Sequence, residues 1–330
     1  MRESQEQKAQ PVGAGQEDAW AFLSSLEEKR ILYPRDPHFR EALWDAEKVF
    51  DGEPFPVLHA IALLVIKPEA LAGRRVDSIL NFLAEHDFEP VYIQPFAFTR
   101  HIVRELWRYQ WNAATIEKMD LVDRVNCVQP TAMLLVRDGQ DPRELPATVR
   151  LKSLKGAALP EERSDDSIRA ALDSPNRMIT FVHTADEPAD LVREFGIFLD
   201  RGERRSLFET LRGQPPALDF ARCRQQLKEL EEDAPITDFN PDAAWLRICS
   251  RAGGQDRDAL AQQRAQFQQN GSIDWWAFLA LAEKVGAEEW DVLSICTAVV
   301  EHEDAGYAPT IKFDQEGIMA WLNGSARLCQ

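Results

Sequence analysis

A histidine and a glutamate eleven residues apart form the pairing with the clearest chemistry in the sequence. His183 follows the apolar run from Met178 to Val182, and Glu194 falls in the stretch from about Asp186 to Phe195, whose pattern is helical. A carboxylate that accepts from one imidazole nitrogen fixes the tautomer and leaves the other nitrogen as a nucleophile. Phosphoryl transfer through histidine requires this arrangement. A histidine at a strand end is more often structural, so its surroundings decide the interpretation.

Alternating strands and helices are predicted to position this pair. The strands are expected at 61–66, 91–98, 131–136 and 178–182, with His183 following the last. Helices are expected at 74–86, from an N-cap at Thr99 through Trp107 and Tyr109, over the amphipathic stretch 142–154 and at 186–195. Residues 160–175 are expected to form a long loop. This order predicts an α+β, ferredoxin-like (βαββαβ) domain with an antiparallel sheet and extra helices.

The flanking regions are expected to fold differently from this domain. Residues 1–18 are polar and predict a disordered tail, and residues 19–56 predict a helical extension broken near Pro34. The central domain is expected to span 57–213, with Pro215-Pro216 at the junction. Residues 214–330 carry amphipathic helical patterns without a recognisable motif and predict an all-α domain of unknown role.

Several motifs recur in a fixed order around the pair. The first strand ends in Ile66-Lys-Pro-Glu69, and a basic stretch runs from Leu151 to Gly156 before Pro160 and Ile168-Arg169. The run Thr180-Phe-Val-His-Thr-Ala-Asp-Glu-Pro then precedes Glu194-Phe-Gly196. Over about residues 57–211, this succession resembles the nucleoside diphosphate kinase family, in which a strand ending in histidine is followed at the same spacing by an orienting glutamate.

The resemblance implies a role for each matching residue. His183 would carry the phosphoryl group and Glu194 would orient it. Trp107 stands where the family has a tyrosine, forty residues after the lysine, and Thr180 stands where it has an asparagine. The residues that the resemblance implies in nucleotide or phosphate binding are Lys67, Trp107, Lys152, Arg169 and Thr180. The substrates would be a nucleoside triphosphate and diphosphate, with Mg²⁺ bound to the nucleotide and no metal site of protein ligands.

Departures from the family pattern leave two interpretations open. Thr184 and Ala185 replace a glycine and a serine after the histidine, and Ala158 replaces a phosphate-binding threonine. The first interpretation is a phosphotransferase acting through His183 on a nucleoside diphosphate or another acceptor. The alternative is a catalytically impaired nucleotide-binding or scaffold protein that uses the domain as a binding platform. Acidic clusters such as Glu161-Glu162 are interpreted as solvated surface.

The composition limits which cellular compartment and which partners are expected. A formal net charge of −17 argues against nucleic acid as a partner, because such binding needs clustered basic residues. No apolar run is long enough for a transmembrane helix, and five scattered cysteines fit a reducing cytoplasm. The C-terminal helices are a candidate surface for a protein partner, with Trp275-Trp276 as the minority candidate patch. Homo-oligomers are common in the family and are a further expectation.

Overall fold

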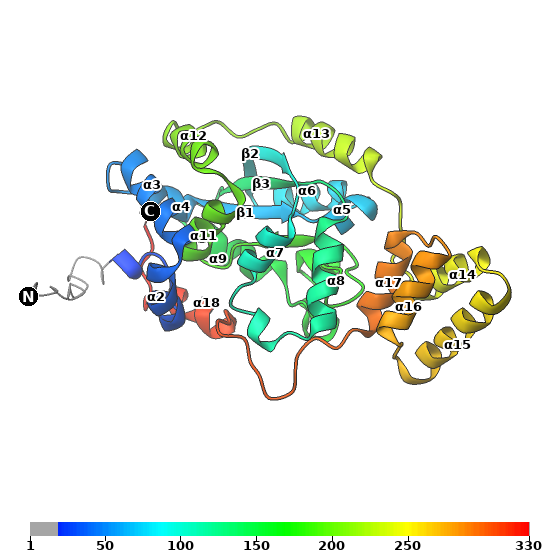
Figure 1. Cartoon of the computed structure of the whole chain (residues 1–330). Helices are drawn as coiled ribbons and strands as arrows, with labels where there is room; N and C mark the ends of the chain where they lie inside the picture. Colours follow the sequence, from blue (N-terminus) through cyan, green and yellow to red (C-terminus); the bar gives the residue numbers. More distant parts are fainter. Residues whose placement is uncertain (1–18, 330) are drawn as a thin grey trace, which may run out of the picture.

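A four-stranded sheet forms the centre of the computed structural model, which describes residues 19–329 (Figure 1). The tail predicted for residues 1–18 lies outside the described residues. The strand order is β2-β3-β1-β4 and every neighbouring pair is antiparallel, as a ferredoxin-like fold requires. The strands are β1 (Ile61–Ile66), β2 (Phe88–Phe96), β3 (Thr131–Asp138) and β4 (Val182–Thr184).

Strand β1 is central because its six residues are all apolar and all buried. It pairs with β3 on one side, where Ile66 lies opposite Ala132, and with β4 on the other, where Val65 lies opposite His183. The strands predicted at 61–66 and 131–136 are therefore confirmed, and β2 begins three residues before its predicted start. Pairing with β1 holds the backbone of His183 in the sheet.

The last strand corrects the sequence prediction. The sequence predicts a strand over 178–182 that ends at His183, but β4 comprises only Val182–Thr184. Phe181 has a left-handed backbone with φ of 64°, which a strand does not accommodate. The turn at residues 180–181 is held by Glu69, whose carboxylate accepts from the backbone N–H groups of Thr180 and Phe181 at 3.3 Å each. The strand therefore begins only after this turn.

Helices connect the strands and pack on them. The predicted N-cap at Thr99 is confirmed, since its hydroxyl accepts from the N–H of Ile102, but the helix ends at Leu106, before Trp107 and Tyr109. The expected loop 160–175 contains two short helical turns. These elements are α5 (Pro68–Ala72), α6 (Val76–Glu85), α7 (Arg100–Leu106), η2 (Trp111–Ala113), α8 (Ile116–Cys127), α9 (Ala147–Lys155), η3 (Pro160–Glu162), α10 (Ile168–Ala171) and α11 (Pro188–Phe198).

The N-terminal extension is helical and broken near Pro34, as predicted. It comprises α2 (Glu27–Leu32), η1 (Tyr33–Arg35), α3 (Pro37–Val49) and α4 (Phe55–Ala60). Helix α3 packs against α11, which carries Glu194, and the contact is close at Gly196, whose added Cβ would overlap the carbonyl oxygen of His38. The extension therefore supports the helix that bears Glu194.

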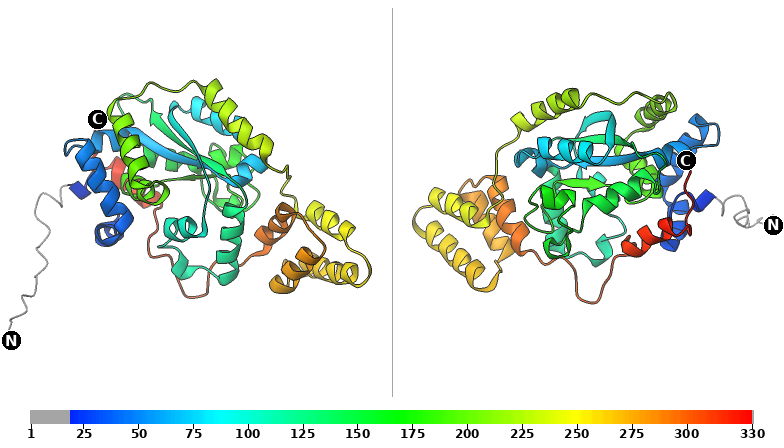
Figure 2. Two further views of the ribbon diagram at one scale, coloured as in Figure 1. Left: turned by 45° about the horizontal axis from the view of Figure 1, so that its top comes forward. Right: turned by 180° about the vertical axis from the view of Figure 1, so that it is seen from behind.

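The region after residue 213 is largely helical, as predicted, but its helices do not gather in one body (Figure 2). After α12, α13 packs on α5, α6 and β2, while α14–α17 form a bundle that meets the central domain at α8. A segment that we call the strap, residues 300–314, then leads to α18, which packs on Val149 of α9. The helices are α12 (Arg201–Arg212), α13 (Phe220–Asp233), α14 (Pro241–Arg251), α15 (Gly254–Asn270), α16 (Trp275–Lys284), α17 (Glu289–Val299) and α18 (Gln315–Leu322).

This distribution corrects the expectation of a separate domain over 214–330, because apolar surfaces on the central domain are covered by helices from distant parts of the chain. The bundle α14–α17 has its own apolar interior, in which Trp245 and Phe278 are fully buried. Among the helices of residues 19–329, none combines the length and the apolar character needed to cross a membrane.

Candidate active site

The imidazole of His183 is held by the carboxylate of Glu194. Its Nε2 lies 3.0 Å from each carboxylate oxygen. A carboxylate only accepts, so Nε2 carries the proton and Nδ1 keeps its lone pair. The side chain of His183 is 15% exposed and that of Glu194 is 7% exposed, which shields the hydrogen bond while the ring stays accessible. Trp107 packs edge-on against the ring at 5.8 Å between centroids and restricts its rotation.

A cavity of about 320 Å³ opens beside this ring. The predicted residues that line it are Lys67, Trp107, Arg169, Thr180, His183 and Glu194. Lysine and arginine side chains outnumber carboxylates in its wall. In an enclosed site, an excess of cationic side chains favours an anionic ligand, because burying a charge without a counter-ion costs free energy.

Lys67 reaches the cavity from the end of β1, but it is already paired. Its Nζ lies 2.5 Å from Oε1 of Glu69 and donates to the hydroxyl of Thr180 at 3.3 Å and to the carbonyl of Met178 at 3.4 Å. The ammonium group is almost fully buried. Glu69 therefore neutralises part of the charge that the sequence pattern assigned to phosphate.

Helix α9 brings two lysines to a single carboxylate oxygen. Nζ of Lys152 and Nζ of Lys155 lie 3.2 Å and 3.1 Å from Oδ1 of Asp186. Burial lowers the pKa of Lys155 to about 7, against the opposing effect of Asp186. Burial of Asp186 would raise its pKa, but Lys152 and Lys155 hold that pKa far below its ordinary value. This triad is thus locally rich in positive charge.

Arg169 lies at the short helix α10 and also lines the cavity. Its Nη1 donates to the carbonyl of Gly156 at 2.9 Å, while its buried Nε has no hydrogen-bond partner within residues 19–329. Burial lowers the pKa of Arg169 to about 10, and the neighbouring Arg163 adds to this effect. A buried guanidinium with an unused donor is suited to an incoming anion.

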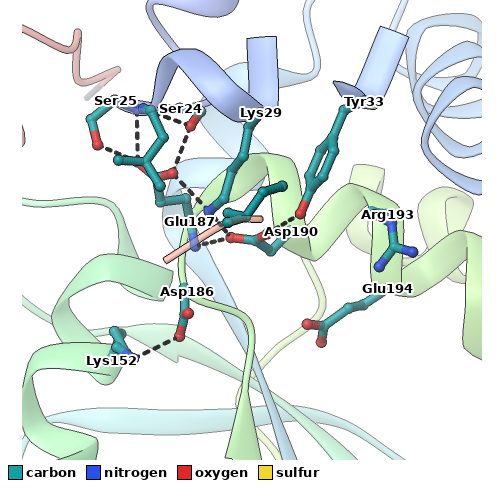
Figure 3. Close-up of polar contacts among 12 residues, drawn as sticks. Ser24, Ser25, Lys29, Tyr33, Lys152, Asp186, Glu187, Asp190, Arg193 and Glu194 are labelled. Atoms are coloured by element: carbon teal, nitrogen blue, oxygen red, sulfur yellow. Dashed lines mark hydrogen bonds and ion pairs between the residues drawn. The ribbon is translucent and has the colours of Figure 1, made fainter. Parts of the chain in front are cut away.

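The N-terminal extension closes one side of the cavity through a buried ionic network (Figure 3). Nζ of Lys29 lies 2.8 Å from Glu187 and 2.5 Å from Asp190, and the hydroxyl of Tyr33 donates to Asp190 at 2.6 Å. Asp190 also accepts from the backbone N–H of Glu187 and so ends the loop between β4 and α11. The network fixes the first turn of α11 and, with it, the helix that presents Glu194.

A second buried arginine secures the same helix. Arg193 precedes Glu194 and pairs with Asp36 at 2.7 Å, at the N-terminus of α3. It also donates to the carbonyl of Glu105 at 2.6 Å and lies over the ring of Tyr109 at 5.1 Å. Three distant segments are thereby joined next to the proposed catalytic pair.

The strap also contributes to the wall of the cavity. The backbone N–H of Thr310 donates to the carbonyl oxygen of Tyr109 at 2.8 Å. Ile311 and Phe313, also in the strap, line the cavity. Phe313 also lies under the ammonium group of Lys29 at 5.2 Å. The N-terminal extension and the C-terminal region therefore both contribute to one site of the central domain.

The cavity brings together the predicted residues except Lys152, which contacts Asp186 outside the lining. The site predicted from the sequence does not include Lys155, Lys29, Tyr33 or the strap, although all of them line the cavity. For Lys155 a signal existed, since it lies three residues after Lys152 on the same helix and such residues share a face. No sequence pattern indicates the others, because their segments reach the site only through tertiary contacts.

A family model for nucleoside diphosphate kinase matches residues 61–204, which contain the sheet, the cavity residues of the central domain and the His183–Glu194 pair. Residues 61–204 form a divergent nucleoside diphosphate kinase domain. Its family binds nucleotides and transfers phosphoryl groups. The match ends shortly after α11, so the strap and the bundle α14–α17 lie outside the matched residues.

Individual proteins are similar to a little under half of the chain. A thioredoxin domain-containing protein 3 homolog of Heliocidaris crassispina is 26% identical over 145 residues, which are 44% of this chain and 17% of that protein. The nucleoside diphosphate kinase structure of Aquifex aeolicus is 19% identical, with a TM-score of 0.36, over 44% of this chain and 97% of that chain. That of Encephalitozoon cuniculi is 12% identical, with a TM-score of 0.37, over 49% of this chain and 95% of that chain.

Proposed function

We propose that the chain is a phosphotransferase that takes the terminal phosphate of a nucleoside triphosphate onto His183 and passes it to a nucleoside diphosphate or another acceptor. The observation that carries this proposal is the hydrogen bond of 3.0 Å between Nε2 of His183 and Glu194, at the wall of a cavity rich in cations. It leaves Nδ1 as the nucleophile and places a negative charge where the ring becomes positive during attack.

The transfer would proceed in two displacements. Nδ1 of His183 attacks the terminal phosphorus, an N–P bond forms, and the bond to the bridging oxygen breaks as the nucleoside diphosphate leaves with its electron pair. Glu194 stabilises the charge on the ring, and the proton stays on Nε2. An oxygen of the acceptor then attacks the phosphorus, and Nδ1 regains its lone pair.

Residues around the cavity would position the substrate. Arg169 has an unused buried donor for a phosphate oxygen, and Lys67 and Thr180 lie at the end of β1 and beside β4. Trp107 offers an aromatic wall next to His183. Positioning of this kind lowers the barrier because phosphoryl transfer depends mainly on alignment and on charge stabilisation.

Magnesium would reach the site on the nucleotide phosphates. The carboxylates lining the cavity are already engaged: Asp186 with Lys155, Asp190 with Lys29 and Glu194 with His183. Within residues 19–329, no group of three or more His, Cys, Asp or Glu side chains is arranged to hold a metal ion. This arrangement favours an ion held by phosphate oxygens and water, where it would neutralise charge on the triphosphate.

Nucleotide binding without transfer is the second candidate function. It is favoured by the pairing of Lys67 with Glu69, which reduces the positive charge available to a transferring phosphoryl group. In that case the domain would act as a binding platform, and the bundle α14–α17 would be the surface for a protein partner.

Incubation with γ-labelled ATP and Mg²⁺ separates the two functions. Transfer predicts an acid-labile, alkali-stable label on the protein that His183→Ala abolishes and that unlabelled GDP removes. The matched control is His101→Ala, which alters an exposed histidine of α7 and should leave the label intact. Binding of ATP without any label would support the platform, and a label that survives His183→Ala would refute the assigned nucleophile.

A further inference from the structure

The two lysines of α9 differ in their access to the cavity although they share one partner. Lys155 lines the cavity and its side chain is 6% exposed, whereas Lys152 lies outside the lining and is 22% exposed. Both ammonium groups contact Oδ1 of Asp186. The structure therefore separates two residues that the sequence presents as neighbours on one helix face.

Charge balance leaves this corner of the cavity positive. Asp186 can neutralise one of the two lysines, and Arg169 adds a further cation whose buried Nε is unpaired within the described residues. Lys155, Arg169 and Asp186 all line the same cavity. A buried excess of positive charge is stabilised when an anion enters.

Lys155 also has donor capacity to spare. Its ammonium group contacts Asp186 at 3.1 Å and makes only a long hydrogen bond of 3.4 Å to the carbonyl of Thr184. An ammonium group carries three N–H donors, so a phosphate oxygen can be bound while the contact with Asp186 is kept. Asp186, which lies in the sequence between β4 and α11, thus holds the ammonium group of Lys155 in the wall of the cavity.

We propose that Lys155 is the lysine of α9 that contacts the phosphate groups of a bound nucleotide, and that Lys152 serves to balance Asp186 rather than to bind the ligand. This inference rests on the proposed function in one respect, the identity of the anion as a nucleotide. It requires that the protein bind the nucleotide, but not that it transfer a phosphoryl group. The ligand class is a di- or triphosphate chain, since one isolated phosphate would use only part of the cluster of Lys155 and Arg169.

Calorimetric titration of the full chain with ADP tests the assignment. Lys155→Met should weaken ADP binding about 10- to 100-fold, because a charged hydrogen bond to phosphate is lost. Lys152→Met is the matched control, since it removes the same charge from the same carboxylate, and its effect should stay below about threefold. Equal effects, or a larger effect of Lys152→Met, would overturn the proposal. Lys155→Gln replaces Lys155→Met if the latter does not fold, with the same expected loss.

Two further probes keep this test separate from the proposed function. Adenosine lacks phosphate, so any affinity for it should be the same in both variants and in the unaltered chain. Pyrophosphate lacks the nucleoside and should show the same Lys155-specific loss as ADP. A protein that binds ADP and pyrophosphate but never becomes labelled would refute transfer and leave this inference standing. A protein that binds neither ADP nor pyrophosphate would refute the inference.

Discussion

Replacing Lys29 by methionine tests how the N-terminal extension supports the site. The ammonium group of Lys29 contacts Glu187 at 2.8 Å and Asp190 at 2.5 Å, and the side chain is 2% exposed. Methionine preserves most of the side-chain volume, so the change removes the charge without opening a large cavity. Two buried carboxylates at the start of α11 then lose their shared cation.

The expected cost follows from these contacts. Breaking a buried ion pair by removing one partner typically costs about 3–5 kcal/mol, because the remaining charge is left uncompensated. Glu187 keeps donors from Ser24, Ser25 and Trp321, and Asp190 keeps the hydroxyl of Tyr33, so we expect the lower end of this range, about 3 kcal/mol. A loss of this size is a large fraction of the stability of an ordinary domain.

Urea denaturation at pH 7 and at pH 5 measures this loss. In the unaltered chain, burial would raise the pKa of Glu187, but Lys29 holds that pKa below its ordinary value, so the stabilisation from Glu187 is still present at both pH 7 and pH 5. Burial already raises the pKa of Asp190, and without Lys29 both carboxyl groups would take up protons more readily in the folded state. This proton uptake stabilises the folded state of Lys29→Met as pH falls from 7 to 5, so the difference in unfolding free energy between the two proteins is smaller at pH 5.

The control is Lys312→Met, which makes the same chemical change at an exposed position of the strap, next to Phe313. It should alter the free energy of unfolding by less than about 0.5 kcal/mol. If Lys29→Met were no more destabilising than this control, or if its deficit were the same at pH 5 and pH 7, the account of the buried network would be wrong.

Three other changes probe the site and its support. Glu194→Gln should slow the labelling of His183 about 100-fold, measured as the initial rate with γ-labelled ATP, because the developing positive charge loses its counter-charge. Lys155 has a folded-state pKa of about 7, so from pH 7 to pH 9 the unfolded chain binds more protons and the unaltered protein should gain about 2 kcal/mol of stability relative to Lys155→Met in urea titrations. Gly196→Ala should destabilise the protein by at least about 2 kcal/mol in thermal or urea unfolding, because its Cβ would overlap the carbonyl oxygen of His38.

Each of these changes has its own contradicting result. An unchanged labelling rate in Glu194→Gln would mean that the carboxylate does not stabilise the ring charge. If the unfolding free energies of Lys155→Met and the unaltered chain changed with pH in parallel, Lys155 would be charged in both the folded and the unfolded state. For Gly196→Ala the control is Gly253→Ala, where an added Cβ meets nothing within 4 Å, and equal stability of the two variants would refute the close packing of α3 on α11.

Much of the central domain could be predicted because its signals are local. The run Ile61–Ile66 is apolar on both faces, which indicates a central strand, and Thr99 has the side chain and the position of an N-cap. The spacing of His183 and Glu194 places them on a strand and on the helix that follows it, and the structure confirms that the two side chains meet at 3.0 Å. These features depend on periodicity and on short-range connections.

The β4 strand marks the limit of such signals. The apolar run from Met178 to Val182 resembles a strand, but Glu69, more than a hundred residues earlier, accepts from the backbone of the turn at Thr180 and Phe181. A backbone conformation imposed by a distant carboxylate leaves no trace in local periodicity.

The composition of the site was decided by tertiary structure in the same way. By itself the sequence determined the alternation of strands and helices, the spacing of His183 and Glu194 and a basic stretch on α9, since each follows from neighbouring residues. Only the fold decided that Lys155 rather than Lys152 faces the cavity, that Glu69 neutralises Lys67, and that Phe313 of the strap forms part of the wall. Burial and charge pairing depend on which distant segments meet, and that is fixed by packing of the whole chain rather than by the pattern of any one segment.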